Sequence, residues 1–342
     1  MKRPVSLFLL FAFLVIQLYV AKIPEAHQVQ TTSWLAVSSE PGGLVSRNGD
    51  YYLVTPSSSF QLQSNGISIT SRASGLNWVE VPEPSGAGIW RMALTAQGVP
   101  LVGIGGAIYP APNATGTLWI DSGDHRLYYS QPPLSGMQSV GTTLSYVKKV
   151  VWAPDAQSAA VLAQGPEGWG IYVWTHANQT YPALILRGGQ QQIANYGILR
   201  NQTVIAALKN GHILQQGHGL VSIPPMEQVR VSRQYASALG HTATQAIFWS
   251  NGKWNAYTLP KQLKWVGVPR FSKNGTMAAT LAQNLQGTWH LLLYGHHYTL
   301  DVHMPFTDVS EYHLLGFMGD HWILITVPEG PHRGTYAWWI NH

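Results

Sequence analysis

The side chains of this chain best suited to bind a metal ion are its 14 histidines. His296, His297 and His303 lie close together in the sequence. However, no H-E-x-x-H motif is present, and neighbouring residues of a strand point to opposite faces of a sheet. The sequence therefore predicts no metal site, and we expect the pair His296 and His297 at the surface or in a turn.

The motifs that organise other kinds of catalysis are also missing from the sequence. It has no G-x-S-x-G, no Walker A segment and no cysteine, and its 15 acidic residues form no recognisable catalytic pair. Four glycines between residues 98 and 106 lack the spacing of a dinucleotide-binding loop. We therefore predict no catalytic residues and no cofactor.

A repeated pattern of short apolar segments runs through the chain. The clearest copy is the segment 150–164, VVWAPDAQSAAVLAQ, followed by GIYVW at 170–174. A second copy is PRFSKNGTMAATLAQ at 269–283, followed by WHLLLY at 289–294. Each copy has the order strand, polar turn, strand, loop, strand, and repeats of this kind are typical of a β-propeller.

Seven copies can be aligned on the turn between their first two strands, with an average spacing of about 45 residues, the length of a four-stranded blade. The turns begin at Ser46, Thr95, Ala153, Leu199, Ser232, Phe271 and Gly316. The sequence thus predicts an all-β chain whose residues 33–342 form one propeller of seven blades. Six blades are the alternative, because the copy around residues 228–257 matches poorly. The long second interval predicts inserted loops at 107–117 and 131–143.

The last copy ends one strand short of a complete blade. Its third strand is expected at 335–340, directly before the final residues. The segment 33–37, SWLAV, lies ahead of the first copy and can supply the missing strand. We therefore expect the two ends of the propeller to pair, because an open ring would leave exposed sheet edges.

The segment 152–162 with IYVW at 171–174 resembles the WD40-like repeats of TolB-type propellers. Ala156 replaces the usual glycine, and the copy at 271–275 has Lys273 and Asn274 in place of proline and aspartate. The resemblance implies a propeller that is extracytoplasmic and binds proteins. It implies no active site, because these repeat positions are structural and propellers serve many functions.

The N-terminal residues have the layout of an export signal. Lys2 and Arg3 precede an apolar run from Val5 to Ala21. We interpret residues 1–22 as a transmembrane signal anchor or a signal peptide, and residues 23–32 as a stalk. The domain 33–342 would lie outside the cell membrane on a single-pass anchor, or be secreted if the signal is cleaved.

The charges beyond this segment do not predict a nucleic-acid partner. The formal net charge is +5 at pH 7, and Lys148 and Lys149 form the one adjacent basic pair in the main domain. Without a dense cluster of Lys and Arg in the sequence, the electrostatic footprint of a nucleic-acid-binding protein is missing.

Loops that join second to third strands gather on one face of a propeller, where binding residues are often found. The segments 105–117, 164–169, 283–288 and 328–334 are predicted to be such loops. Their candidate binding residues are Tyr109, Glu167, Trp169, Gln286, Glu329, His332 and Arg333. The alternative is that these are ordinary solvated loops.

The predicted function is a module that binds a protein or a component of the cell envelope. The alternative is a propeller enzyme, either a hydrolase or a quinone-dependent dehydrogenase, with its site at the central channel. Carboxylates, histidines and arginines converging at that channel would favour the enzyme.

Overall fold

The structure is a computed structural model. It describes residues 27–30, 34–47, 50–55, 59–62, 69–72, 78–82, 89–93, 107–111, 116–120, 125–131, 135–140, 143–187, 192–259 and 262–340. All regular elements in these ranges are strands, β1 to β31. The predicted N-terminal segment 1–22 lies outside them. Among the described residues, no helix has the length and apolarity needed to cross a bilayer.

The first half of the described chain forms four antiparallel sheets, each named here after its first strand. The β3 sheet contains β3 (Gly43–Arg47), β4 (Asp50–Val54), β5 (Ser59–Leu62) and β6 (Ile69–Arg72). The β7 hairpin contains β7 (Trp78–Pro82) and β8 (Ile89–Ala93). The β9 sheet contains β9 (Ala107–Pro110), β10 (Thr117–Ile120), β11 (Leu127–Gln131) and β12 (Ser135–Ser139). The β13 sheet contains β13 (Ser145–Trp152), β14 (Ser158–Gly165), β15 (Gly168–Thr175) and β16 (Asn178–Arg187).

Four further sheets follow, and two of them include a strand from the N-terminal part of the chain. The β17 sheet contains β17 (Ile193–Ile198), β18 (Val204–Leu208), β19 (Ile213–Gln215) and β20 (Gly219–Leu220). The β21 sheet contains β21 (Glu227–Val231), β22 (Ser237–His241), β23 (Gln245–Ser250) and β24 (Lys253–Thr258). The β25 sheet contains β25 (Lys264–Phe271), β26 (Met277–Gln283), β27 (Trp289–Gly295), β28 (Thr299–His303) and β1 (His27–Gln30). The β29 sheet contains β29 (His313–Met318), β30 (Trp322–Val327), β31 (Gly334–Trp339) and β2 (Leu35–Ser38).

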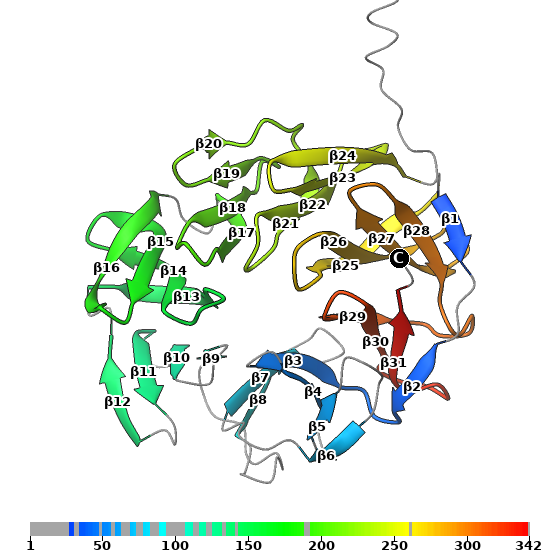
Figure 1. Cartoon of the computed structure of the whole chain (residues 1–342), viewed down its shortest axis with the longest axis horizontal. Coiled ribbons are helices and arrows are strands. Elements are labelled where there is room, and N and C mark those ends of the chain that lie inside the picture. Colours follow the sequence, from blue (N-terminus) through cyan, green and yellow to red (C-terminus); the bar gives the residue numbers. More distant parts are fainter. Residues whose placement is uncertain are drawn as a thin grey trace, which may run out of the picture.

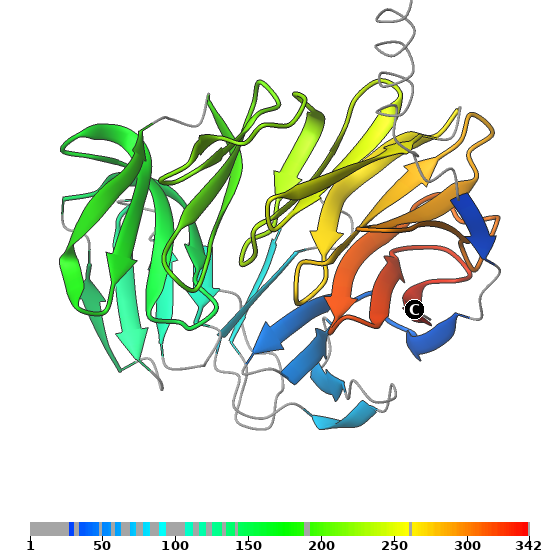
Figure 2. The ribbon, with the colours of Figure 1, turned by 45° about the horizontal axis from the view of Figure 1, so that its top comes forward.

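The sheets are arranged around a common centre, with their first strands on the inside (Figures 1 and 2). The first strands of successive sheets contact one another, as β13 does with β17 and β17 with β21. The β7 hairpin lies between two of them, because β7 contacts both β3 and β9. This radial arrangement of four-stranded sheets is that of a β-propeller, as the repeats predict.

The apolar core is divided into layers that lie between neighbouring sheets. One cluster of buried residues joins the β9 and β13 sheets, and the next joins the β13 and β17 sheets. Equivalent clusters continue around the ring as far as the β3 sheet. Second strands contribute fully buried alanines, such as Ala160 and Ala206, to the same cluster as the large side chain of Tyr196. Small residues on these strands allow adjacent sheets to pack closely.

The turn between first and second strands follows one geometry in three sheets. The N–H of Ala156 donates to Ala153 O at 3.0 Å, and Gly275 and Gln202 make the equivalent bonds. All three residues have positive φ, with values of 58° for Ala156, 70° for Gly275 and 65° for Gln202. The aligned turns at Ala153, Leu199 and Phe271 are thereby confirmed, and Ala156 keeps the left-handed conformation although it lacks glycine's freedom.

The second predicted unit differs from the structure. The segments expected as inserted loops, 107–117 and 131–143, contain strands β9 and β12, which are the first and last strands of a four-stranded sheet with β10 and β11. The sequence signal is weak there because β9 has four residues and ends in Pro110, while β12 is rich in serine and includes Gly136. The predicted turn and strand at 95–103 lie outside the described residues.

The ring is closed by the N-terminal strand β2, as predicted. It pairs antiparallel with β31, with Ala36 opposite Tyr336, and β2 lies beside β31 in Figure 1. The Thr335 hydroxyl donates to Glu40 O at 3.0 Å. A Cβ on Gly334 would lie 2.5 Å from Ser38 O, so the close approach of β2 requires glycine there.

Strand β1 was not expected, because its residues fall in the segment 23–32 that the sequence analysis interprets as a stalk. It pairs in parallel with β28, with His27 opposite Thr299 and Gln30 opposite Val302. It thus covers the outer edge of the β25 sheet. Trp34, between β1 and β2, donates from Nε1 to His303 O at 3.0 Å.

The register of β2 predicts opposite effects for two adjacent substitutions. Val37 is 5% exposed and packs against the β29 and β3 sheets, whereas Ala36 is exposed. Val37→Asp buries a carboxylate in that core, so we expect it to lower the free energy of unfolding by about 3 kcal/mol or more. Ala36→Asp should change it by no more than about 0.5 kcal/mol. Urea denaturation measures both, and equal losses would contradict the register.

Candidate functional site

Three of the four predicted binding loops do connect second to third strands. They are the connections from β14 to β15, from β26 to β27 and from β30 to β31. Because strands alternate in direction, these connections lie on one face of the propeller, called here the loop face. The last two belong to neighbouring sheets, while the first is on the β13 sheet, farther around the ring (Figure 1).

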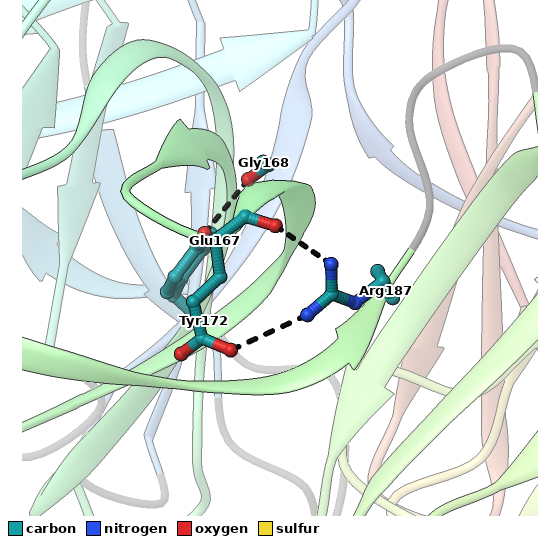
Figure 3. A network of polar contacts seen from close by, with 4 residues as sticks. All are labelled: Glu167, Gly168, Tyr172 and Arg187. Atoms are coloured by element: carbon teal, nitrogen blue, oxygen red, sulfur yellow. Dashed lines mark hydrogen bonds and ion pairs between the residues drawn. The ribbon is translucent and has the colours of Figure 1, made fainter.

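The loop before β15 is held by contacts within its own sheet (Figure 3). Arg187 donates to Glu167 O at 3.1 Å, and its guanidinium lies 3.5 Å from the Glu167 carboxylate. The Tyr172 hydroxyl donates to Gly168 O at 2.7 Å. The side chains of Glu167 and Arg187 are 60% and 71% exposed, so this pair contributes little to stability. Trp169 is half-buried at the start of β15.

The connections from β26 to β27 and from β30 to β31 are turns, and the second contains a histidine held by side-chain contacts. Gln286 is exposed in a turn where its N–H donates to Asn284 Oδ1 at 3.0 Å. Glu329 and Arg333 are exposed in the connection to β31. His332 stacks on Phe306 with ring centroids 3.9 Å apart, and its Nε2 lies 3.3 Å from Asp308 Oδ1. These contacts fix the position of His332 on the loop face.

Tyr109 is not in such a loop. It lies in β9, the first strand of its sheet, and is half-buried against the core shared with the β13 sheet. Its carbonyl oxygen accepts a hydrogen bond of 2.7 Å from Trp152 Nε1. The main chain of Tyr109 therefore joins two blades.

Cationic side chains from several described sheets meet at the centre of the ring. A cavity of about 330 Å³ is lined by residues of β3, β4, β13, β17, β21, β25 and β29 and by the turns that follow β21 and β25. Its lining includes Lys273 and four further cationic residues that act electrostatically on one another, which we call the channel cluster: Lys149, Arg230, Arg233 and Arg270. They come from three different sheets. The described lining of this cavity includes no Asp, Glu or His.

Strand β17 holds the segment that carries two of these arginines. The Asn195 side chain donates from Nδ2 to Val231 O at 3.1 Å and accepts from Val231 N at 3.2 Å. The N–H of Ile198 donates to Arg233 O at 3.0 Å. A Cβ on Gly197 would lie 2.0 Å from Ser232 O, so glycine is required where the two backbones approach. Arg230 and Arg233 therefore project from a fixed main chain.

Lys149 and Arg270 are also positioned by contacts between sheets. The Tyr196 hydroxyl donates to Lys149 O at 2.7 Å, and the Lys149 ammonium lies 5.5 Å from the centre of the Tyr196 ring. This ring position is favourable for a cation. Arg270 donates from Nε to Leu314 O of β29 at 3.3 Å. The channel cluster is thus tied to β17 on one side and to β29 on the other.

The cluster is electrostatically unfavourable in the free protein. Burial, together with the charges of Arg233, Arg230 and Arg270, lowers the pKa of Lys149 to about 8. Burial and the charges of Arg233 and Arg230 also lower the pKa of Arg270 to about 10. The lysine can relieve this repulsion by losing its proton, but guanidinium groups stay charged at ordinary pH. This concentration of positive charge in the described lining makes the channel cluster the candidate functional site, and the chemistry it offers is the binding of anions.

A second cavity of about 580 Å³ adjoins the first on the side of the loop face. Both cavities are lined by Arg230 and Pro269. The larger one is bordered by the connections after β18 and β22 and has a mixed lining that includes Lys209, Glu227 and Trp265. A ligand at the channel cluster therefore has space beside it toward the loop face.

The channel cluster could not be recognised in the sequence, because its members are far apart in the chain. One signal in the repeats could have predicted part of the cluster. The N–H groups of Ser232 and Ser272 make equivalent bonds to residues five positions later, so Arg230 and Arg270 occupy the same repeat position. Two arginines at one inner-strand position of successive blades must approach each other. Lys149 and Arg233 occupy other positions and could not be aligned in this way.

No protein-family model matches the chain, and no curated protein matches its sequence. Among solved structures, the C-terminal WD40 domain of Sif2 is similar, with a TM-score of 0.51 and 12% identity over 92% of this chain and 100% of that one. The β-propeller domain of Cps50 (Swd1) from Myceliophteria thermophila gives a TM-score of 0.48 and 9% identity, over 91% of this chain and 99% of that one. For Hsv2 from Kluyvelomyces marxianus the values are 0.45 and 10%, over 86% and 90% of the two chains.

These similarities concern the fold. The chain is a β-propeller that resembles WD40 propellers, which agrees with the resemblance of its repeats. At these identities the comparison does not transfer a ligand or an activity. Among the described residues, no group of three or more His, Asp or Glu side chains is arranged to hold a metal ion.

The proximity of the channel cations predicts a change in the titration of Lys149. Arg233 is the strongest charge acting on it, and a positive charge disfavours the protonated form. Arg233→Ala should therefore raise the pKa of Lys149 from about 8 toward the ordinary value of 10.5. NMR of the ¹³Cε resonance measures this titration. The control is Arg200→Ala, which removes an exposed arginine after β17 and should leave the pKa of Lys149 unchanged. An unchanged pKa of Lys149 in Arg233→Ala would contradict the proximity of these cations.

Proposed function

We propose that this chain is a membrane-anchored, extracytoplasmic β-propeller that binds an anionic group of a protein or of a cell-envelope component in its central channel. One observation carries the proposal: the channel cluster brings four cations together, and the described lining has no acidic residue to neutralise them. An anion that enters the channel removes the repulsion within the cluster and gains charge-assisted hydrogen bonds.

The same lining favours binding over catalysis. General acid–base catalysis needs a group that exchanges protons near neutral pH, usually a histidine or carboxylate. The described lining of the 330 Å³ cavity contains neither, and its charged groups are three guanidinium groups and the amines of Lys149 and Lys273. Of these, Lys149, with a pKa of about 8, can exchange a proton near neutral pH. A propeller enzyme would pair it with a histidine or carboxylate, and the described lining offers none.

The placement outside the membrane rests on the sequence. Lys2 and Arg3 precede an apolar run, and the repeats resemble those of extracytoplasmic TolB-type propellers. Strand β1 begins at His27, so four residues, 23–26, separate the predicted segment 1–22 from the β25 sheet. We propose that this short link holds the propeller near the membrane, or that cleavage releases it.

The blade number is proposed from the sheets. Seven of the sheets formed by the described residues have four or five strands, and we propose that these are seven blades. The β7 hairpin occupies the interval between β3 and β9. The loop-face residues Glu167, Trp169, Gln286, Glu329, His332 and Arg333 remain a proposed contact surface for a larger partner, beside the mouth of the channel.

The anchor proposal predicts how the full chain fractionates. It should remain in the membrane pellet after an alkaline carbonate wash and be digested by protease added outside the cells. A variant that lacks residues 5–21 loses the apolar run and should stay inside the cell in soluble form. Release of the intact full chain by carbonate, or its protection from external protease, would argue against the anchor.

The channel proposal predicts stabilisation by multivalent anions. At constant ionic strength, sulfate, phosphate and citrate should raise the melting temperature of the full chain by a few degrees relative to chloride, because binding to the folded state stabilises it. Arg230→Ala with Arg270→Ala should abolish this rise. Lys253→Ala removes an exposed cation of β24 and is the matched control. An identical anion response in all three proteins would exclude the channel as the site.

A further inference from the structure

We infer that the channel cluster recognises a tetrahedral dianionic group, such as the phosphate of a phosphomonoester, whose organic part extends into the larger cavity. This inference rests on the proposed function, in which the channel binds an anion, and adds the chemical class of the ligand. The group can belong to a free phosphorylated molecule or to the headgroup of a lipid.

The charge of the cluster calls for more than one negative charge. Three guanidinium groups and the ammonium groups of Lys149 and Lys273 line the same cavity without a described acidic residue. A carboxylate supplies a single charge on two oxygens in one plane. A phosphate monoester supplies between about 1.5 and 2 negative charges at pH 7 on three acceptor oxygens. It therefore compensates the cluster better in the same volume.

The directions from which the cations enter also favour a tetrahedral group. Lys149 comes from β13, Arg230 and Arg233 come from β21 and the turn after it, and Arg270 comes from β25. Donors on three separate sheets can reach different oxygens of a tetrahedral anion. Arginine forms paired, parallel hydrogen bonds with phosphate, which adds geometric selectivity. A planar carboxylate can satisfy only part of this set at once.

The donors are held in place before a ligand binds. Asn195 and Gly197 fix the main chain of the segment that carries Arg230 and Arg233, and Leu314 O accepts from Arg270. Binding therefore requires little ordering of the protein, which preserves affinity. Cations that repel one another persist in a fold only where the surrounding contacts determine their positions, and these contacts do so.

The two cavities indicate how the rest of the ligand lies. The 330 Å³ cavity holds the channel cluster, and Arg230 and Pro269 also line the 580 Å³ cavity on the side of the loop face. The larger cavity has apolar groups, Met226 and Trp265, beside polar ones, as is common for sites that bind organic ligands. A phosphate at the cluster thus leaves the attached organic group in this second space.

The test compares four probes by calorimetric titration of the full chain at pH 7.5 and fixed ionic strength. They are inorganic phosphate, sulfate, phenyl phosphate and benzoate. We expect phosphate and sulfate to bind, and phenyl phosphate to bind more tightly than either. Benzoate should bind at least about tenfold more weakly than phenyl phosphate, because its carboxylate has less charge and one acceptor oxygen fewer, which costs at least one charge-assisted hydrogen bond.

Two variants separate the parts of the site. Arg230→Met with Arg270→Met should weaken both phosphate and phenyl phosphate by at least about tenfold. Ala243→Trp places a large ring at an exposed position that lines the larger cavity, so it should reduce phenyl phosphate binding to the level of phosphate and leave phosphate unchanged. Lys253→Met is the matched control, and thermal melting confirms that each variant is folded.

A further arm distinguishes the source of the phosphate. Phosphatidylcholine vesicles containing phosphatidic acid should capture the chain if a lipid headgroup reaches the cluster, and binding of phenyl phosphate without capture assigns the site to soluble phosphoesters. Either result supports the inference if Arg230→Met with Arg270→Met abolishes the observed binding. Benzoate binding as tightly as phenyl phosphate would overturn the inference and leave the proposed function standing. If no anion binds in the channel, both fail.

Discussion

The pairing of β2 with β31 is the constraint on which the rest of the structure depends. A propeller is held together between blades by side-chain packing, and its last sheet would otherwise end in an open edge. Here the chain completes that sheet with its own N-terminal strand, with Val37 buried between the β29 and β3 sheets. Because the ring closes, the first strands all converge on one axis, and side chains distant in sequence meet there.

The convergence of the first strands also brings the cations of the channel cluster close enough to repel one another. The four cations lie far apart in the sequence, and the closed ring places Lys149, Arg230, Arg233 and Arg270 around one cavity. Burial and the repulsion that results together lower the pKa values of Lys149 and Arg270. The hydrogen bonds of Asn195 and the absence of a side chain at Gly197 keep β21 in place against this repulsion. A fold that maintains such a cluster supports a role in holding an anion.

The sequence predicts those features that depend on local chemistry. The turns at Ala153, Leu199 and Phe271 have polar residues that tolerate positive φ, and the missing last strand follows from counting, so the repeats and the closure were predictable. Strands β9 and β12 were not, because they are short and contain proline, glycine and serine. The channel cluster was not predicted, because the proximity of its four cations follows from the closed ring. The equivalent repeat positions of Arg230 and Arg270 would have predicted that these two arginines approach each other. Three of the four predicted binding loops lie on the loop face, while Tyr109 lies in a strand.

The most direct test of the account is to locate a bound anion. Tungstate is a tetrahedral dianion with strong anomalous scattering, so crystals of the chain grown with it reveal its position independently of any activity. The account predicts an anomalous peak in the central channel, bounded by Arg230, Arg233, Arg270 and Lys149. Tungstate bound at surface lysines with no peak in the channel would contradict it.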